Sequence, residues 1–126
     1  MKTQLTKVKY ADDILMGIFL QMPEKNIGSQ KDLTDFLDKN QDEFSLIKEL
    51  GNFYYGDYQH IINRLFATFG FLNCIRGKTH AEGRGYELIP EEIQKHKEVV
   101  EGYLSLEELS QTKLIANSFS NYLKNN

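Results

Sequence analysis

The sequence lacks the cysteines that staple small extracellular domains, because Cys74 is the only one among 126 residues. A single cysteine excludes an internal disulfide framework and fits a reducing compartment. No stretch approaches the roughly 20 consecutive apolar residues that a membrane helix needs. The beginning, MKTQLTKVKYADD, has lysines but no apolar run before the first acids. We therefore expect no signal peptide, no membrane anchor and a cytoplasmic protein.

An excess of positive charge is also lacking, since 15 Lys and Arg stand against 18 Asp and Glu, for a net charge of -3. This argues against a general nucleic-acid coat, whose affinity comes from massed cations. The distribution is uneven, however. Residues 1–10 hold three lysines and no acid, and residues 54–86 hold four basic against two acidic groups, whereas 11–53 and 87–126 are acidic. Positive charge is thus concentrated in an N-terminal arm and in the middle of the chain.

Apolar residues at helical spacing predict that most of the chain is helical. Two capping boxes mark helix starts, one formed by Ser29 and Asp32 and the other by Ser105 and Glu108. Gly70 is expected to end the helix before it. The expected helices cover residues 10–22, 29–40, 42–50, 57–69, 91–103 and 106–126.

The stretch FLNCIRGKTHAEGRGYELIP, residues 71–90, has the pattern of two short strands joined by a basic, glycine-rich loop. Apolar and polar residues alternate in both arms, as they do in half-buried strands. The alternation of Cys74 with Leu72 predicts a buried strand position, where a thiol is inert.

The 57–69 segment predicts a helix with two distinct faces. Its apolar stripe consists of Tyr58, Ile61, Ile62, Leu65, Phe66 and Phe69. On the opposite face, at spacings of three and four, lie His60, Asn63, Arg64 and Ala67, with Thr68 at the edge.

The segments YQHIINRLFATFGFLNCI and RGKTHAEGRGYELIP, following two helices, resemble a winged helix-turn-helix domain. The resemblance covers about residues 10–90. It implies an α+β, predominantly helical fold, in which a recognition helix is followed by a β-wing. One departure is the distance between the second helix and the recognition helix: about 17 residues, 40–56, lie where most winged helices have only a few.

The resemblance implies sequence-specific binding of double-stranded DNA, as in a transcriptional regulator without a cofactor. A helix fits the major groove, where Arg binds guanine and Asn binds adenine through paired hydrogen bonds. The candidates on the recognition helix are Gln59, His60, Asn63, Arg64 and Thr68. The wing candidates, for phosphate or minor-groove contacts, are Arg76, Lys78, Thr79, His80 and Arg84.

The chain is expected to divide into a winged-helix domain with a basic N-terminal arm, residues 1–90, and a C-terminal helical extension, residues 91–126. An apolar stripe in the last helix consists of Ile115, Phe119, Tyr122 and Leu123. Such a stripe packs either on the domain's own core or on a second copy. We expect a homodimer, since two copies double the phosphate contacts on a two-fold DNA site.

Catalytic and metal-binding patterns are weak. RGKT at 76–79 fits the end of a phosphate-binding loop, but Leu72 stands where that motif needs glycine. Cys74, His60, His80 and His96 lack the paired short spacing of zinc ligands. We therefore expect neither an enzyme nor a metal site.

The alternative function is a protein–protein interaction adaptor in a replication, phage or transcription complex, because winged helices also serve that role. The acidic segments 11–53 and 87–126 favour it, as do Tyr54 and Tyr55, which we expect to be exposed.

Overall fold

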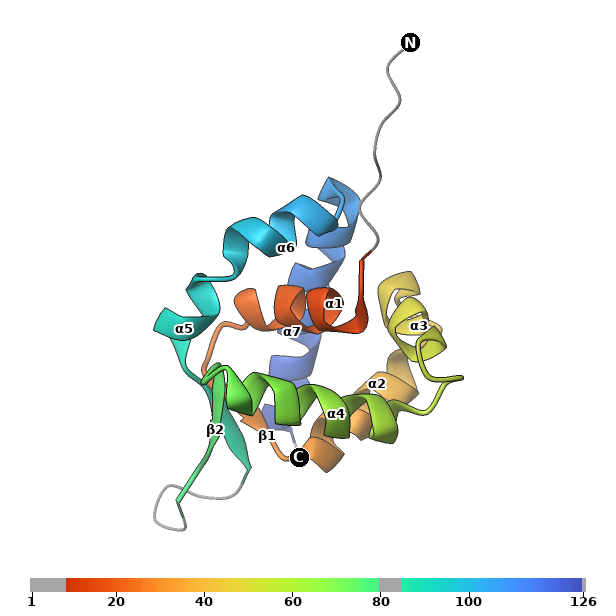
Figure 1. Ribbon diagram of the computed structural model, residues 1–126. Helices are drawn as coiled ribbons and strands as arrows, with labels where there is room; N and C mark the ends of the chain where they lie inside the picture. Colours follow the sequence, from red (N-terminus) through yellow and green to blue (C-terminus); the bar gives the residue numbers. More distant parts are fainter. Residues whose placement is uncertain (1–8, 80–84, 126) are drawn as a thin grey trace.

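The computed structural model describes residues 9–79 and 85–125, which contain seven helices and three short strands (Figure 1). The helices are α1 (Ala11–Leu20), α2 (Gln30–Asn40), α3 (Ser45–Asn52), α4 (Tyr58–Phe71), α5 (Pro90–Gln94), α6 (Lys97–Tyr103) and α7 (Leu106–Lys124). The strands are β1 (Asn26–Gly28), β2 (Ile75–Gly77) and β3 (Tyr86–Leu88). They form one antiparallel sheet in the order β1-β3-β2. The expected α+β, predominantly helical class is confirmed.

Both predicted capping boxes are present. The Ser29 hydroxyl accepts a hydrogen bond from the Asp32 backbone N–H at 3.0 Å, and the Asp32 carboxylate accepts one from the Ser29 N–H at 2.9 Å. Ser105 and Glu108 make the same pair of bonds, at 3.1 and 2.9 Å, at the start of α7. These bonds satisfy backbone donors that a helix start leaves unpaired, so α2 and α7 begin where the sequence predicts.

The end of α4 differs from its prediction. Gly70 lies inside the helix, which continues to Phe71 with Leu72 as its C-cap. The chain reverses at Asn73, whose φ of 62° is in the left-handed region that Asn tolerates better than most residues. Leu72 therefore sits at a helix end rather than in a strand, and β2 begins only at Ile75.

Two further features of the fold were not predicted. The expected 91–103 helix is divided into α5 and α6, with Lys95 and His96 between them. Strand β1 lies in the segment expected only to separate the first two helices. It pairs with β3, and the Leu88 N–H donates to the Lys25 carbonyl at 2.8 Å just beside it.

Helix α1 occupies the centre of the molecule, between the C-terminal helices and α4 (Figure 1). It packs against α3, α4, α5, α6 and α7. Phe19 of α1 contacts Phe66 and Phe69 of α4 edge-on, with ring centroids 6.4 and 5.8 Å apart. The apolar side of α4 is thereby fixed on the core, which determines which side of this helix remains outside.

The apolar stripe of α7 belongs to the same core. Ile115 and Phe119 are fully buried, and Tyr122 and Leu123 pack against the core from its edge. The Phe119 ring lies 5.0 Å from that of Phe36 in α2. This corrects the expectation that the stripe forms a dimer contact, because Ile115 and Phe119 face the core of their own chain.

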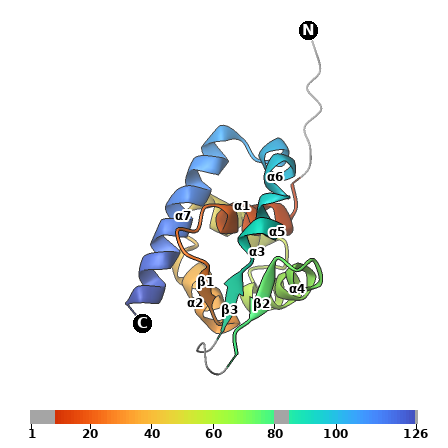
Figure 2. The ribbon, with the colours of Figure 1, turned by 90° about the vertical axis from the view of Figure 1, so that its left-hand side faces the viewer.

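The C-terminal helices are consequently not a projecting extension. A single cluster of buried side chains joins residues of α5, α6 and α7 to those of the preceding elements. In Figure 2, α7 and α4 lie on opposite sides of the molecule. Within the described residues, no helix combines the length and apolarity needed to cross a membrane.

Candidate nucleic-acid interface

The outer face of α4 carries every residue predicted for the recognition helix. Gln59, His60, Asn63, Arg64 and Thr68 are all exposed. The predicted apolar stripe of the same helix is entirely buried. Asp57 caps the helix by accepting a hydrogen bond from the His60 backbone N–H at 3.1 Å. The segregation of the two faces was therefore predictable from spacing alone.

Tyr54, in the turn between α3 and α4, lies against this outer face. Its ring centroid is 4.7 Å from that of His60, and the Arg64 guanidinium carbon lies 5.3 Å from it. Tyr54 is half-buried and packs against the core, whereas Tyr55 is fully exposed, so the expected exposure holds for Tyr55 only. The contacts of Tyr54 join a turn to a helix face, and nothing in residue spacing indicated them.

On its other side, the outer face of α4 borders α2 across a shallow open hollow lined by Gln30, Asp57, Gln59, His60 and Asn63. Amide side chains dominate this lining. The Gln30 amide also donates to the Tyr86 hydroxyl at 3.4 Å, which links α2 to β3. The hollow therefore presents hydrogen-bond donors and acceptors rather than an apolar surface.

Strand register places Asn26, Glu87 and Arg76 side by side on the outer face of the sheet. Glu87 forms an ion pair with Arg76, and Lys25 Nζ lies 4.0 Å from the second oxygen of Glu87. Lys78 Nζ donates to the Asn26 side-chain oxygen at 2.5 Å. Two cations thus flank the Glu87 carboxylate, and a third, Lys78, lies beside Asn26, so three cations and one carboxylate gather on this face of the described sheet.

Lys25 was not among the predicted site residues. It precedes β1, and its neighbours on the sheet become visible only once that strand is known. Of the other predicted wing residues, Thr79 is exposed. His80 and Arg84 lie outside the described residues. In Figures 1 and 2, β2 and β3 extend from the end of α4, at the same end of the molecule as that helix.

The last described lysine of the basic N-terminal arm is engaged within the protein. Lys9 Nζ lies 2.7 Å from a Glu49 oxygen and 2.5 Å from a Glu108 oxygen. Burial lowers the pKa of Lys9, but the two carboxylates outweigh burial and hold it above 10.5. Lys9 therefore ties the start of α1 to α3 and α7 instead of projecting toward a ligand.

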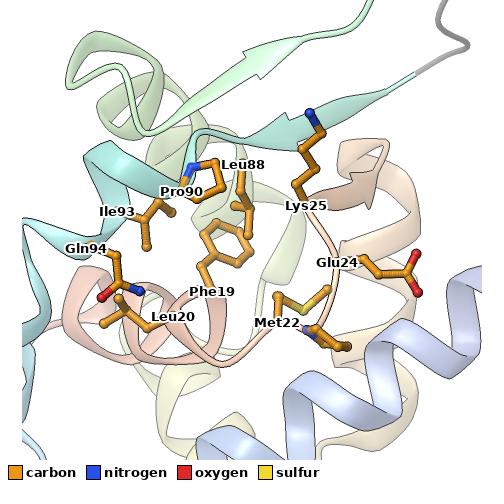
Figure 3. A pocket seen from close by; sticks show the side chains of 10 residues that line it. Phe19, Leu20, Met22, Glu24, Lys25, Leu88, Pro90, Ile93 and Gln94 are labelled. Atoms are coloured by element: carbon orange, nitrogen blue, oxygen red, sulfur yellow. The ribbon is translucent and has the colours of Figure 1, made fainter.

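Cys74 and one pocket bear on the catalytic patterns considered in the sequence. Cys74 is fully buried, as predicted, but it precedes β2 instead of lying in a strand, and burial raises the pKa of its thiol. Figure 3 shows a pocket between α1, β3 and α5, walled by Phe19, Met22, Leu88, Pro90 and Ile93. Its lining contains no Ser, Cys or His that could act as a nucleophile or base. Within residues 9–79 and 85–125, no three His, Cys, Asp or Glu side chains gather as a metal site would require.

Two surfaces therefore stand out as candidate contacts: the polar outer face of α4, and the basic outer face of the sheet formed by Lys25, Arg76 and Lys78. They adjoin because β2 follows α4 directly and packs against it. Comparison of the chain with family models, with curated proteins and with solved structures finds no match.

Proposed function

We propose that the protein is a winged helix-turn-helix protein that binds double-stranded DNA sequence-specifically and regulates transcription. In this proposal α4 is the recognition helix, and β2 and β3 form the wing. The order α1, β1, α2, α4, β2, β3 and the sheet order β1-β3-β2 support it. Helix α3 is then an addition between the second helix and the recognition helix.

The observation that carries the proposal is the composition of the exposed face of α4. Arg64 can donate two hydrogen bonds to guanine, and Asn63 can pair with adenine through its amide. Gln59, His60 and Thr68 add donors and acceptors on the same face. The major groove is wide enough to admit an α-helix, and α4 offers it one exposed polar side.

The cations of the sheet supply the second part of the proposed interface. Phosphate contacts fix the position of a protein on the duplex without distinguishing sequences. Arg76 lies in β2, next to α4, and Lys78 directly follows this strand, while Lys25 joins them from across the sheet. A chain with a net charge of -3 then binds DNA through a local concentration of positive charge.

The test begins with selection of binding sites from random duplexes, followed by fluorescence anisotropy of a selected and a scrambled duplex at two salt concentrations. We expect affinity to fall steeply with salt, because each phosphate contact releases counterions. Lys113→Ala is the matched control, since it removes an exposed cation from α7 on the opposite side of the molecule. Absence of duplex binding even at low salt would refute the proposal.

We further propose that the DNA-binding form is a homodimer, now with the outer side of α7 as its contact. Leu106 and Leu114 of this helix are 86% and 59% exposed, and Val99 of α6 is exposed as well. Leu114→Lys should convert a dimer to a monomer in light scattering without changing the circular dichroism spectrum. A wild-type protein that is monomeric at tens of micromolar would exclude the dimer.

A protein–protein adaptor remains the second candidate, supported by apolar side chains next to the same face. Phe71, at the end of α4, is 86% exposed, and Tyr55 is fully exposed in the turn before the helix. Exposed aromatic residues are common anchors in protein interfaces. Failure to bind any duplex at low salt, by a folded protein, would favour this function over DNA binding.

A further inference from the structure

The turn between α3 and α4 holds Tyr54 in a defined position. The Tyr54 and Gly56 backbone N–H groups both donate to the Gly51 carbonyl, at 3.1 and 2.8 Å, and the Asp57 N–H donates to the Tyr54 carbonyl at 3.0 Å. Tyr55 and Gly56 follow with φ values of 56° and 83°. Left-handed backbone at a tyrosine is uncommon and persists only where its surroundings fix it. This turn therefore has one fixed backbone conformation, from which the Tyr54 side chain extends.

Tyr54 connects this turn to the exposed face of α4. One part of its side chain packs against the core, and its ring meets His60 and Arg64, which lie one helical turn apart. The guanidinium position is that of a cation attracted by the ring face. Two of the side chains assigned to base contacts thus rest on one aromatic ring.

We propose that Tyr54 is a positioning residue for DNA recognition, which holds the His60 and Arg64 side chains in place before the duplex binds. This role rests on the proposed DNA-binding function. A free arginine side chain samples many rotamers, and ordering it at an interface opposes binding. The Tyr54 ring removes part of that cost. The 40–56 insertion then has a role, because it supplies an aromatic residue that a short turn would not place here.

The expected consequence is specificity rather than general affinity. A bidentate contact between Arg64 and a base requires one orientation of the guanidinium plane, whereas a phosphate contact tolerates many. Loss of the ring should therefore weaken binding to a selected duplex more than binding to a scrambled one.

The test compares Tyr54→Leu, which keeps an apolar side chain but removes the ring, with Tyr54→Phe, which keeps the ring. We expect Tyr54→Leu to lower the ratio of specific to random affinity about threefold to tenfold, and Tyr54→Phe to keep the wild-type ratio. Circular dichroism and a thermal melt establish that both variants are folded. In a background of His60→Ala and Arg64→Ala, Tyr54→Leu should have no further effect, because Tyr54 acts through those two residues.

A measurement without DNA separates this inference from the proposed function. In proton NMR, the aromatic ring at position 54 should change the chemical shifts of the His60 ring protons and the Arg64 side-chain protons. This ring-current effect is expected in the wild type and in Tyr54→Phe but not in Tyr54→Leu. An unchanged specificity ratio in Tyr54→Leu, or an equal loss in Tyr54→Phe, would overturn the positioning role. Unchanged NMR signals in Tyr54→Leu would overturn it whatever the DNA result, whereas a wild-type protein that binds no duplex refutes the DNA-binding function itself.

Discussion

Helices α4 and α7 both bury an apolar stripe, but their outer faces differ. The outer face of α4 carries two amides, a histidine and an arginine, supported by Tyr54 and adjoined by the cations of the sheet. The outer face of α7 mixes scattered charges with Leu106 and Leu114. The periodicity of a helix reveals which face is apolar, but what covers that face depends on the rest of the fold. The chemistry of the uncovered face is therefore the better guide to function.

The largest effect, a loss of folding stability, is expected for substitutions on the buried side of α7. Phe119→Ala should destabilise the protein by about 3–5 kcal/mol, because it opens a cavity where this ring meets Phe36. Phe119→Asp should unfold it, since a carboxylate would be buried without a partner. Urea denaturation followed by circular dichroism measures both. A stable, folded Phe119→Asp monomer would show that the stripe does not belong to the core.

A substitution on the exposed side of α4 should change DNA recognition rather than stability. Arg64→Ala should reduce discrimination between selected and scrambled duplexes by about 1–3 kcal/mol if Arg64 contacts a base. Its stability to urea should stay close to that of the wild type, since the side chain is exposed. Anisotropy titrations with both duplexes decide the matter, and an unchanged affinity ratio would show that α4 is not the recognition helix.

A smaller effect is expected where Lys9 meets α7. Burial raises the pKa of Glu108, but Lys9 and Ser105 outweigh it and hold the pKa below its ordinary value of 4.5. A lowered folded-state pKa stabilises the protein above the ordinary value, and this contribution is lost as pH falls through the lowered one. Glu108→Gln should keep the capping box but lose the ion pair, at a cost of up to about 1 kcal/mol at pH 7.

The pH dependence provides the check on this ion pair. The difference in unfolding free energy between wild type and Glu108→Gln should shrink as the pH falls below 4.5. Glu108→Ala, which also loses the cap, should be less stable than Glu108→Gln at both pH values. Urea titrations at pH 7 and pH 3 supply these comparisons, and a gap between wild type and Glu108→Gln that persists at pH 3 would rule out the ion pair as its origin.

The smallest effect concerns the sheet. Lys78→Ala should weaken binding to selected and scrambled duplexes alike and lower the salt dependence of log affinity by about one unit. Arg84→Ala is expected to act in the same way. Lys113→Ala on α7 should change neither quantity. A Lys78→Ala variant with wild-type salt dependence would remove the sheet from the interface.

Local signals predicted much of the fold. The capping boxes at Ser29 and Ser105 depend on residues three positions apart, and the two faces of α4 depend on helical spacing, so both were visible in the sequence. Strand β1 was not, because it is three residues long and exists through pairing with β3, about 60 residues later.

The candidate site was predictable to a similar extent. The residues of α4 could be identified from its polar face, and Arg76 and Lys78 from the basic hairpin. Lys25 and Tyr54 could not, since each joins the site through a contact between distant or irregular segments. The burial of Ile115 and Phe119 was one of two outcomes that the stripe allowed, and packing against α1 and α2 decides between them.

In the proposed function, α4 and the adjoining sheet, rather than α7, form the DNA-binding surface. Titration of ¹⁵N-labelled protein with a selected duplex, followed through backbone amide chemical shifts, tests it most directly. The largest changes are expected in α4 and in Ile75–Gly77 and Tyr86–Leu88, with α6 and the outer side of α7 unaffected. Changes centred on α6 and α7, or none at a saturating concentration of duplex in low salt, would contradict it.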